Sequence, residues 1–230
     1  MKKIVFTFIP FFPSKKTFYK YVSSIRKEGF NSIEICLSNS PFLDGKTISN
    51  AFSKVKKNSL STNDFEKVFI FLKKEKFKKV FLVFDSSYLL KRKFLNLINR
   101  KKFSSFFYII PDIDKNDNFY KKNKRKIFLL ISYKNIKNYI NKNGLFYVMN
   151  STKTGEENIN YKNKIYEKKR KKKSSFLIGF GISKIKTINY FNKFFDFIII
   201  GTRIIKTMNK KKKFISYIKN VKNKINKNRK

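Results

Sequence analysis

Eight short apolar runs recur along the chain, separated by longer segments in which Lys and Asn mix with apolar residues. The runs are continuous rather than alternating, which is typical of strands that are covered on both faces. They are KIVFTF (3–8), SIEICL (32–37), VFLVF (80–84), SFFYII (105–110), IFLLI (127–131), LFYVM (145–149), SFLIGF (175–180) and FDFIII (195–200). This pattern predicts eight buried strands.

Four of the intervening segments have the spacing of amphipathic helices. The first closes at Gly29, a suitable C-cap, and the second opens with Thr62, Asn63 or Asp64 as candidates for the N-cap. The helices are expected at residues 17–30, 61–77, 182–191 and 203–225. The segments that flank the fifth run have room for short helices only.

Strand and helix patterns alternate eight times within 230 residues, which predicts an α/β protein with the (β/α)8 TIM-barrel fold. The barrel is expected to span residues 1–230 as a single domain, with a frayed C-terminal tail from about residue 221 to residue 230. A doubly wound α/β sheet is the alternative fold.

The charge balance is strongly basic, with 56 Lys and Arg against 14 Asp and Glu and a net charge of +42. Such a charge usually indicates nucleic acid or an anionic surface as the partner. However, the chain is rich in residues with AT-rich codons and has only 7 Gly and 4 Pro. Our hypothesis is that an AT-biased genome caused much of the Lys excess, and the base composition of the source genome tests it. The Lys runs at 121–126, 168–173 and 210–213 lie between the expected strands or in the last helix, which favours solvated surface over a nucleic-acid footprint.

Several classes of site are excluded by what the chain lacks. There is no His, and Cys36 is the single cysteine, so His-based triads and multi-cysteine metal sites are absent. The start of the chain resembles a signal peptide, but Pro10 and Pro13 interrupt its apolar run and no cleavage site follows. No apolar stretch approaches the ~20 residues needed to cross a bilayer. We therefore expect a cytoplasmic protein with no metal site and no membrane contact.

Three acidic residues stand in apolar surroundings: Glu34, Asp85 and Asp196. If Ile33 and Ile35 face the helices, Glu34 faces the barrel interior. Poor solvation there raises the pKa of a carboxyl group, which suits proton transfer near neutral pH. The alternative is a structural acid that is paired with a Lys.

Glycines gather behind the last three expected strands. Gly155 follows the run at 145–149, Gly181 lies in GFGIS, and Gly201 and Thr202 open GTRII. Barrel enzymes often bind phosphate at this place, through backbone N–H groups and a helix N-terminus. Each glycine taken singly also suits an ordinary turn.

The stretch SIEICLSNSPFLDGKTI (32–48) resembles the second strand and the following loop of the alpha subunit of tryptophan synthase. In this resemblance Glu34 and Asp44 occupy the positions of the two catalytic acids. Further similar segments are FTFIPFFPS (6–14), YVMNSTKTG (147–155), GFGIS (179–183) and IIIGTRIIK (198–206). The spacing from Glu34 to Asp44 is one residue shorter than in the family, and Ser151 replaces an Arg.

The resemblance implies a lyase that cleaves indole-3-glycerol phosphate to indole and glyceraldehyde 3-phosphate in tryptophan biosynthesis. Glu34 is then the acid and base, Asp44 accepts the indole N–H, and Tyr147 supports Glu34. The phosphate-binding residues are Gly155, Gly181, Gly201 and Thr202. The subunit itself uses no cofactor; pyridoxal phosphate belongs to a beta subunit, with which an alpha2beta2 heterotetramer is expected.

Two other functions remain open at this point. The first is a relative that has lost catalysis and only activates its beta partner. The second is a basic protein associated with RNA or the ribosome, for which salt-dependent RNA binding without lyase activity is expected.

Overall fold

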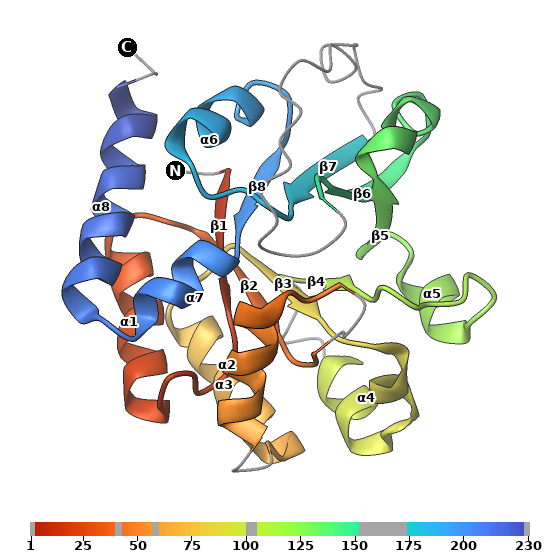
Figure 1. Cartoon of the computed structure of the whole chain (residues 1–230). Helices are drawn as coiled ribbons and strands as arrows, with labels where there is room; N and C mark the ends of the chain where they lie inside the picture. The colour runs from red at the N-terminus through yellow and green to blue at the C-terminus, as the bar shows by residue number, and fades with distance from the viewer. Residues whose placement is uncertain (1–2, 40–42, 57–59, 100–104, 152–173, 228–230) are drawn as a thin grey trace.

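The strands close into a parallel barrel in which each strand pairs with the next and β8 pairs with β1 (Figure 1). The computed structural model describes residues 3–39, 43–56, 60–99, 105–151 and 174–227. The strands are β1 (Ile4–Phe8), β2 (Ser32–Cys36), β3 (Lys79–Val83), β4 (Phe106–Ile109), β5 (Ile127–Ser132), β6 (Gly144–Met149), β7 (Ser174–Gly179) and β8 (Phe197–Ile200). All eight expected strands and the (β/α)8 fold are confirmed.

Helices cover the outside of the barrel (Figure 1). They are α1 (Lys15–Lys27), α2 (Lys46–Lys56), α3 (Thr62–Lys74), η1 (Ser86–Leu90), α4 (Arg92–Asn99), α5 (Asn118–Asn123), η3 (Tyr133–Asn138), α6 (Ile185–Phe191), α7 (Thr202–Met208) and α8 (Lys211–Lys227). The expected helices at 17–30, 61–77 and 182–191 are confirmed as α1, α3 and α6, and the short elements on either side of β5 are α5 and η3. None of the described helices is both long and apolar enough to span a bilayer.

The helix ends were predicted in part. Gly29 follows the end of α1 with φ of 90°, a conformation that favours glycine, as expected. The N-cap of α3 is Ser61, so the prediction of Thr62, Asn63 or Asp64 was wrong. Ser61 accepts the Asp64 N–H at 3.2 Å, and the Asp64 carboxylate accepts the Ser61 N–H at 3.1 Å, so the two residues cap the helix reciprocally.

The single helix expected at 203–225 is two helices, α7 and α8, and that prediction was wrong. Between them, the N–H of Lys210 donates a 3.0 Å hydrogen bond to the carbonyl of Thr207. The Met208 carbonyl accepts a 3.0 Å hydrogen bond from the hydroxyl of Tyr21 on α1. The helix therefore ends where a distant side chain binds its last turn, and α8 starts in a new direction.

The tail expected to be frayed, from about residue 221 to residue 230, begins within the last helix. Residues 221–227 belong to α8, and residues 228–230 lie outside the described residues. Val221 and Ile225 are buried. In Figure 1 α8 lies beside α1, where Lys222 forms an ion pair of 2.8 Å with Glu28.

Apolar side chains fill the barrel interior toward the N-terminal ends of the strands. Phe81 packs edge-on against Phe128 and Phe197, with ring centroids 5.6 Å and 5.3 Å apart. Below them, the ammonium group of Lys79 lies 4.6 Å from the centroid of the Phe197 ring, at the N-terminal end of the strands. This end of the barrel is therefore packed, and open space is left at the C-terminal end.

Candidate active site

A cavity of about 440 Å³ opens at the C-terminal ends of the strands. Its volume is within the range of small-molecule sites. Every strand, or the residue directly after it, contributes to the wall: Thr7, Glu34, Val83, Ile109, Leu130, Tyr147, Phe180 and Ile199. In TIM barrels this end of the barrel is where catalytic residues gather.

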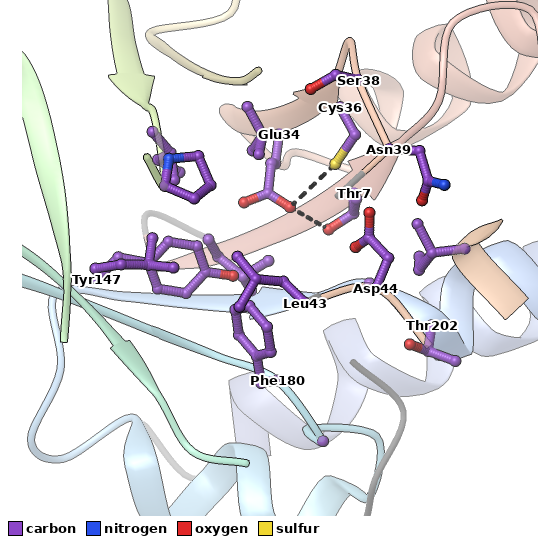
Figure 2. A pocket seen from close by; sticks show the side chains of 18 of the residues that line it. Thr7, Glu34, Cys36, Ser38, Asn39, Leu43, Asp44, Tyr147, Phe180 and Thr202 are labelled. Atoms are coloured by element: carbon purple, nitrogen blue, oxygen red, sulfur yellow. Dashed lines mark hydrogen bonds between the residues drawn. The ribbon is translucent and has the colours of Figure 1, made fainter. Parts of the chain in front are cut away.

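Glu34 is buried in the middle of β2 and points into this cavity (Figure 2). Its Oε1 accepts a 2.6 Å hydrogen bond from the Thr7 hydroxyl and a longer one of 3.9 Å from the Cys36 thiol. Its Oε2 is buried without a hydrogen-bond partner among the described residues. Among the described residues, Glu34 is thus hydrogen-bonded to Thr7 and Cys36 and not paired with a Lys. The alternative of a structural acid paired with a Lys was therefore wrong.

The surroundings of Glu34 change its acidity. Burial raises the pKa of Glu34 from 4.5 to about 7, because the charged form is poorly solvated. The hydrogen bond from Thr7 opposes this rise in pKa, and the nearby Asp44 carboxylate adds to it. Glu34 therefore changes its protonation state near neutral pH, as the sequence predicted.

Asp44 lies in the loop between β2 and α2 and lines the same cavity. Figure 2 shows its carboxylate on the side of the cavity where Thr7 and Glu34 lie. The Gly45 carbonyl accepts the N–H of Ile48 at 3.0 Å, and α2 begins at Lys46, two residues after Asp44. The structure thus brings the two predicted acids together, and residues 40–42 between them lie outside the described residues.

Hydrogen bonds tie the loop that follows β2 to the loop that follows β3. The Tyr88 hydroxyl donates to the Leu37 carbonyl at 3.1 Å, and the Asp85 N–H donates to the Ser38 hydroxyl at 2.9 Å. Asp85, which the sequence singled out, therefore lies at the cavity wall and joins two loops. Asp196 has another role, because its carboxylate accepts the Phe176 N–H at 2.8 Å at the opposite end of the barrel.

Tyr147 on β6 is buried and lines the cavity across from Glu34 (Figure 2). Burial is the main cause that raises the pKa of its hydroxyl, and the charge of Glu34 adds to the rise. Phe180 packs against Tyr147 with the ring centroids 5.7 Å apart, so the two rings form an aromatic wall. Gly179 makes room for this wall, since a Cβ there would overlap the Tyr147 hydroxyl and lie 2.7 Å from a ring carbon.

The glycine-rich end of the cavity follows β7 and β8. Gly181 has φ of 71° and follows Phe180, whose φ of 62° is rare for a residue with a side chain. Gly201 and Thr202 line the same end of the cavity. The structure therefore brings three of the four predicted phosphate-binding residues together, and Gly155 lies outside the described residues.

Sequence reasoning missed several residues of this site. Thr7, Gly179, Arg203 and Lys206 were not predicted, although Thr7 and Gly179 contact the predicted acid and tyrosine. The only signal for Thr7 was a polar residue within an apolar strand. Arg203 and Lys206 are three residues apart on one helix face, which the many other Lys residues of the chain concealed. No three acidic or cysteine side chains within the described ranges come together as metal ligands.

Solved structures share this architecture. A structure from Aquifex aeolicus VF5 has a TM-score of 0.74 at 21% identity and covers 97% of this chain and 92% of that chain. Tryptophan synthase subunit alpha from Legionella pneumophila str. Paris has a TM-score of 0.70 at 15% identity, covering 98% of this chain and 93% of its own. A Mycobacterium tuberculosis tryptophan synthase structure has a TM-score of 0.74 at 10% identity, covering 96% and 91%. At such identities these similarities show the fold.

The family is shown by the sequence itself. No curated protein matches this chain. The family model of the tryptophan synthase alpha chain, however, matches residues 2–230. Since the match spans nearly all of the barrel and its cavity, the chain belongs to the tryptophan synthase alpha chain family, whose members are lyases that cleave indole-3-glycerol phosphate.

Proposed function

We propose that Glu34 and Asp44 carry the lyase reaction of this chain, the retro-aldol cleavage of indole-3-glycerol phosphate to indole and glyceraldehyde 3-phosphate. One observation carries the assignment of Glu34: its carboxyl group is buried at the cavity wall, with one oxygen unpartnered and a pKa of about 7. A carboxyl group with this pKa both donates and accepts protons near neutral pH.

Glu34 serves two proton transfers in this proposal. It gives a proton to C3 of the indole ring, which turns the ring into an iminium that can accept the electrons of the carbon–carbon bond. It takes the proton of the adjacent glycerol hydroxyl as that bond breaks and the aldehyde forms. The proton lost from the hydroxyl balances the proton gained at C3, so the reaction needs no water and no redox partner.

Asp44 stabilises the positive charge that develops on the indole ring. Its carboxylate accepts a hydrogen bond from the indole N–H, and this bond strengthens as the ring becomes an iminium. Tyr147 and Phe180 supply the aromatic wall against which the ring packs. Tyr147 also lies close enough to Glu34 for the two groups to interact electrostatically.

The phosphate is held at the glycine-rich end of the cavity. Backbone N–H groups of Gly181, Gly201 and Thr202 bind its oxygens, together with that of Gly155, which follows β6 in the sequence. The positive φ of Gly181 supports this role, since such turns direct successive N–H groups toward a bound anion.

The alpha subunit needs neither a metal ion nor a cofactor for this chemistry, because both proton transfers are made by a carboxyl group. Its partner is a tryptophan synthase beta subunit, which carries pyridoxal phosphate, and the assembly is an alpha2beta2 heterotetramer in the cytoplasm. The Mycobacterium tuberculosis neighbour, which is a tryptophan synthase, supports the choice of partner.

An indole-release assay with and without a beta subunit tests the function. Replacing Glu34 by Gln lowers kcat by about 10²–10⁴-fold, because the general acid and base is lost. The matched control is Glu66→Gln on α3, which leaves kcat unchanged.

The rival functions give other results in the same assay. A scaffold that only activates its partner releases no indole, and Glu34→Gln then stimulates the beta subunit as well as the wild type does. An RNA-binding protein shows no lyase activity and a salt-dependent affinity for RNA.

A further inference from the structure

Two cationic side chains lie at the glycine-rich end of the cavity. Arg203 and Lys206 are both exposed on α7 and both line the cavity wall. They are three residues apart, so they lie on one face of the helix, directly after Gly201 and Thr202. The proposed phosphate position is therefore bordered by two full positive charges in addition to backbone N–H groups.

The side chain of Arg203 is held in place by the last helix. Its guanidinium carbon lies 5.7 Å from the centroid of the Tyr217 ring on α8, which is a cation–π contact. The Tyr217 hydroxyl donates a 3.2 Å hydrogen bond to the carbonyl of Ser183. Because Ser183 also lines the cavity, Tyr217 connects both segments that border the phosphate position.

The charges around the cavity are arranged by strand. The carboxylates of Asp44, Asp85 and Asp112 come from the loops after β2, β3 and β4, whereas both cations follow β8. A ligand with a doubly charged phosphate at one end is attracted to α7 and repelled by the three carboxylates. This arrangement orients the phosphate of an elongated ligand away from the acids.

We propose that Arg203 is a phosphate-binding residue of this enzyme and that Tyr217 is its positioning residue. Arg203 contributes charge-assisted hydrogen bonds to the phosphate oxygens, for which the planar guanidinium is well suited. Tyr217 keeps the guanidinium over its ring, so that little side-chain freedom is lost when phosphate binds. The identity of the substrate rests on the proposed function, but the phosphate contact does not.

Steady-state kinetics of Arg203→Gln test the contact. The KM for indole-3-glycerol phosphate rises about tenfold with little change in kcat, because a contact made equally in the ground and transition states is lost. In the reverse reaction the KM for glyceraldehyde 3-phosphate rises to the same extent, and the KM for indole stays within about twofold. A purely structural defect raises both KM values together.

The control is Arg125→Gln, which lowers the net charge equally. Arg125 is exposed in the turn before β5, at the opposite end of the barrel from the cavity. This variant keeps both KM values of the wild type. An equal rise of KM in both variants shows an effect of overall charge and overturns the contact.

Variants of Tyr217 test positioning. Tyr217→Leu removes the ring and raises the KM for the phosphate substrate, whereas Tyr217→Phe keeps the ring and most of the effect of Arg203. In the double variant Tyr217→Leu with Arg203→Gln, KM rises no further than in Arg203→Gln alone, because the ring acts through the guanidinium. Fully multiplicative effects overturn the positioning role.

Calorimetric binding of inorganic phosphate and of glycerol 3-phosphate separates this proposal from the proposed function. The Kd for glycerol 3-phosphate rises about tenfold in Arg203→Gln and is unchanged in Arg125→Gln. An unchanged Kd in Arg203→Gln overturns the contact even when the wild type is an active lyase. If the wild type releases no indole but its phosphate binding depends on Arg203, the proposed function fails and the phosphate contact stands.

Discussion

Glu34 combines a chemical advantage with an energetic disadvantage. A pKa of about 7 makes the carboxyl group useful for proton transfer, but the same burial penalises its ionised form in the folded protein. In the unfolded chain the pKa returns to about 4.5. Folding therefore favours the protonated side chain, and stability depends on pH.

The free energy of unfolding is expected to fall as pH rises from about 4.5 to about 7. In this window the unfolded chain releases the Glu34 proton and the folded chain keeps it; above the window both are ionised and the slope disappears. Glu34→Gln removes this titration. The free energy of unfolding of the variant, relative to that of the wild type, is therefore expected to be about 3 kcal/mol higher at pH 8 than at pH 4.5. Urea unfolding at several pH values measures this difference, and parallel curves for the two proteins contradict it.

Thr7 adjusts the acidity of Glu34 from the neighbouring strand. In the wild type, the 2.6 Å hydrogen bond from Thr7 to Oε1 lowers the pKa of the carboxyl group. Thr7→Val keeps the shape of the side chain but removes this hydrogen bond. The pKa of Glu34 then rises above about 7, and the midpoint of its titration moves to higher pH. Carbon-13 NMR of the labelled glutamate carboxyl follows this shift, and a shift to lower pH contradicts the role of Thr7.

Gly179 is expected to be essential for the aromatic wall. In Gly179→Ala the new methyl group displaces the Tyr147 ring, and kcat falls by about tenfold or more. Gly29→Ala is the control, because nothing lies within 4 Å of a Cβ at that position. Its positive φ costs about 1–2 kcal/mol of stability and leaves kcat unchanged. Equal kinetic losses in both variants show a general effect of stability instead.

At the scale of elements, the junction of α7 and α8 is set by α1. Tyr21 stacks on Phe214 with ring centroids 3.9 Å apart and binds the Met208 carbonyl through its hydroxyl. Tyr21→Phe keeps the stacking and leaves the buried carbonyl without this donor, which costs about 1–3 kcal/mol in the free energy of unfolding. Thermal or urea unfolding measures the loss, and wild-type stability in this variant contradicts the contribution of the hydroxyl.

The strands could be read from the sequence because buried parallel strands leave continuous apolar runs, as FDFIII does for β8. The break between α7 and α8 could not, because it depends on the Tyr21 hydroxyl, 187 positions away in the chain. Glu34 was found by the alternation of side chains along β2. Gly179 and Arg203 could not be assigned, since their roles depend on Tyr147 and Tyr217, which only the folded barrel brings near.

At the scale of the whole molecule, the net charge of +42 opposes folding through self-repulsion. Ion pairs such as Lys222 with Glu28 offset little of it, because partly exposed pairs contribute at most about 1 kcal/mol. Added salt is expected to raise Tm, by about 2–4 °C for each kcal/mol of repulsion that it screens. Thermal unfolding at low and moderate ionic strength measures the effect, and a Tm that falls with salt contradicts it.

The contact between Gly179 and Tyr147 also limits how this gene can drift. The chain has only 7 glycines, and at position 179 even a Cβ atom would overlap Tyr147 on the neighbouring strand β6. A larger residue at position 179 therefore requires that Tyr147 first be replaced by a smaller side chain. That first step removes part of the aromatic wall, so we expect neither residue to be replaceable on its own without loss of lyase activity.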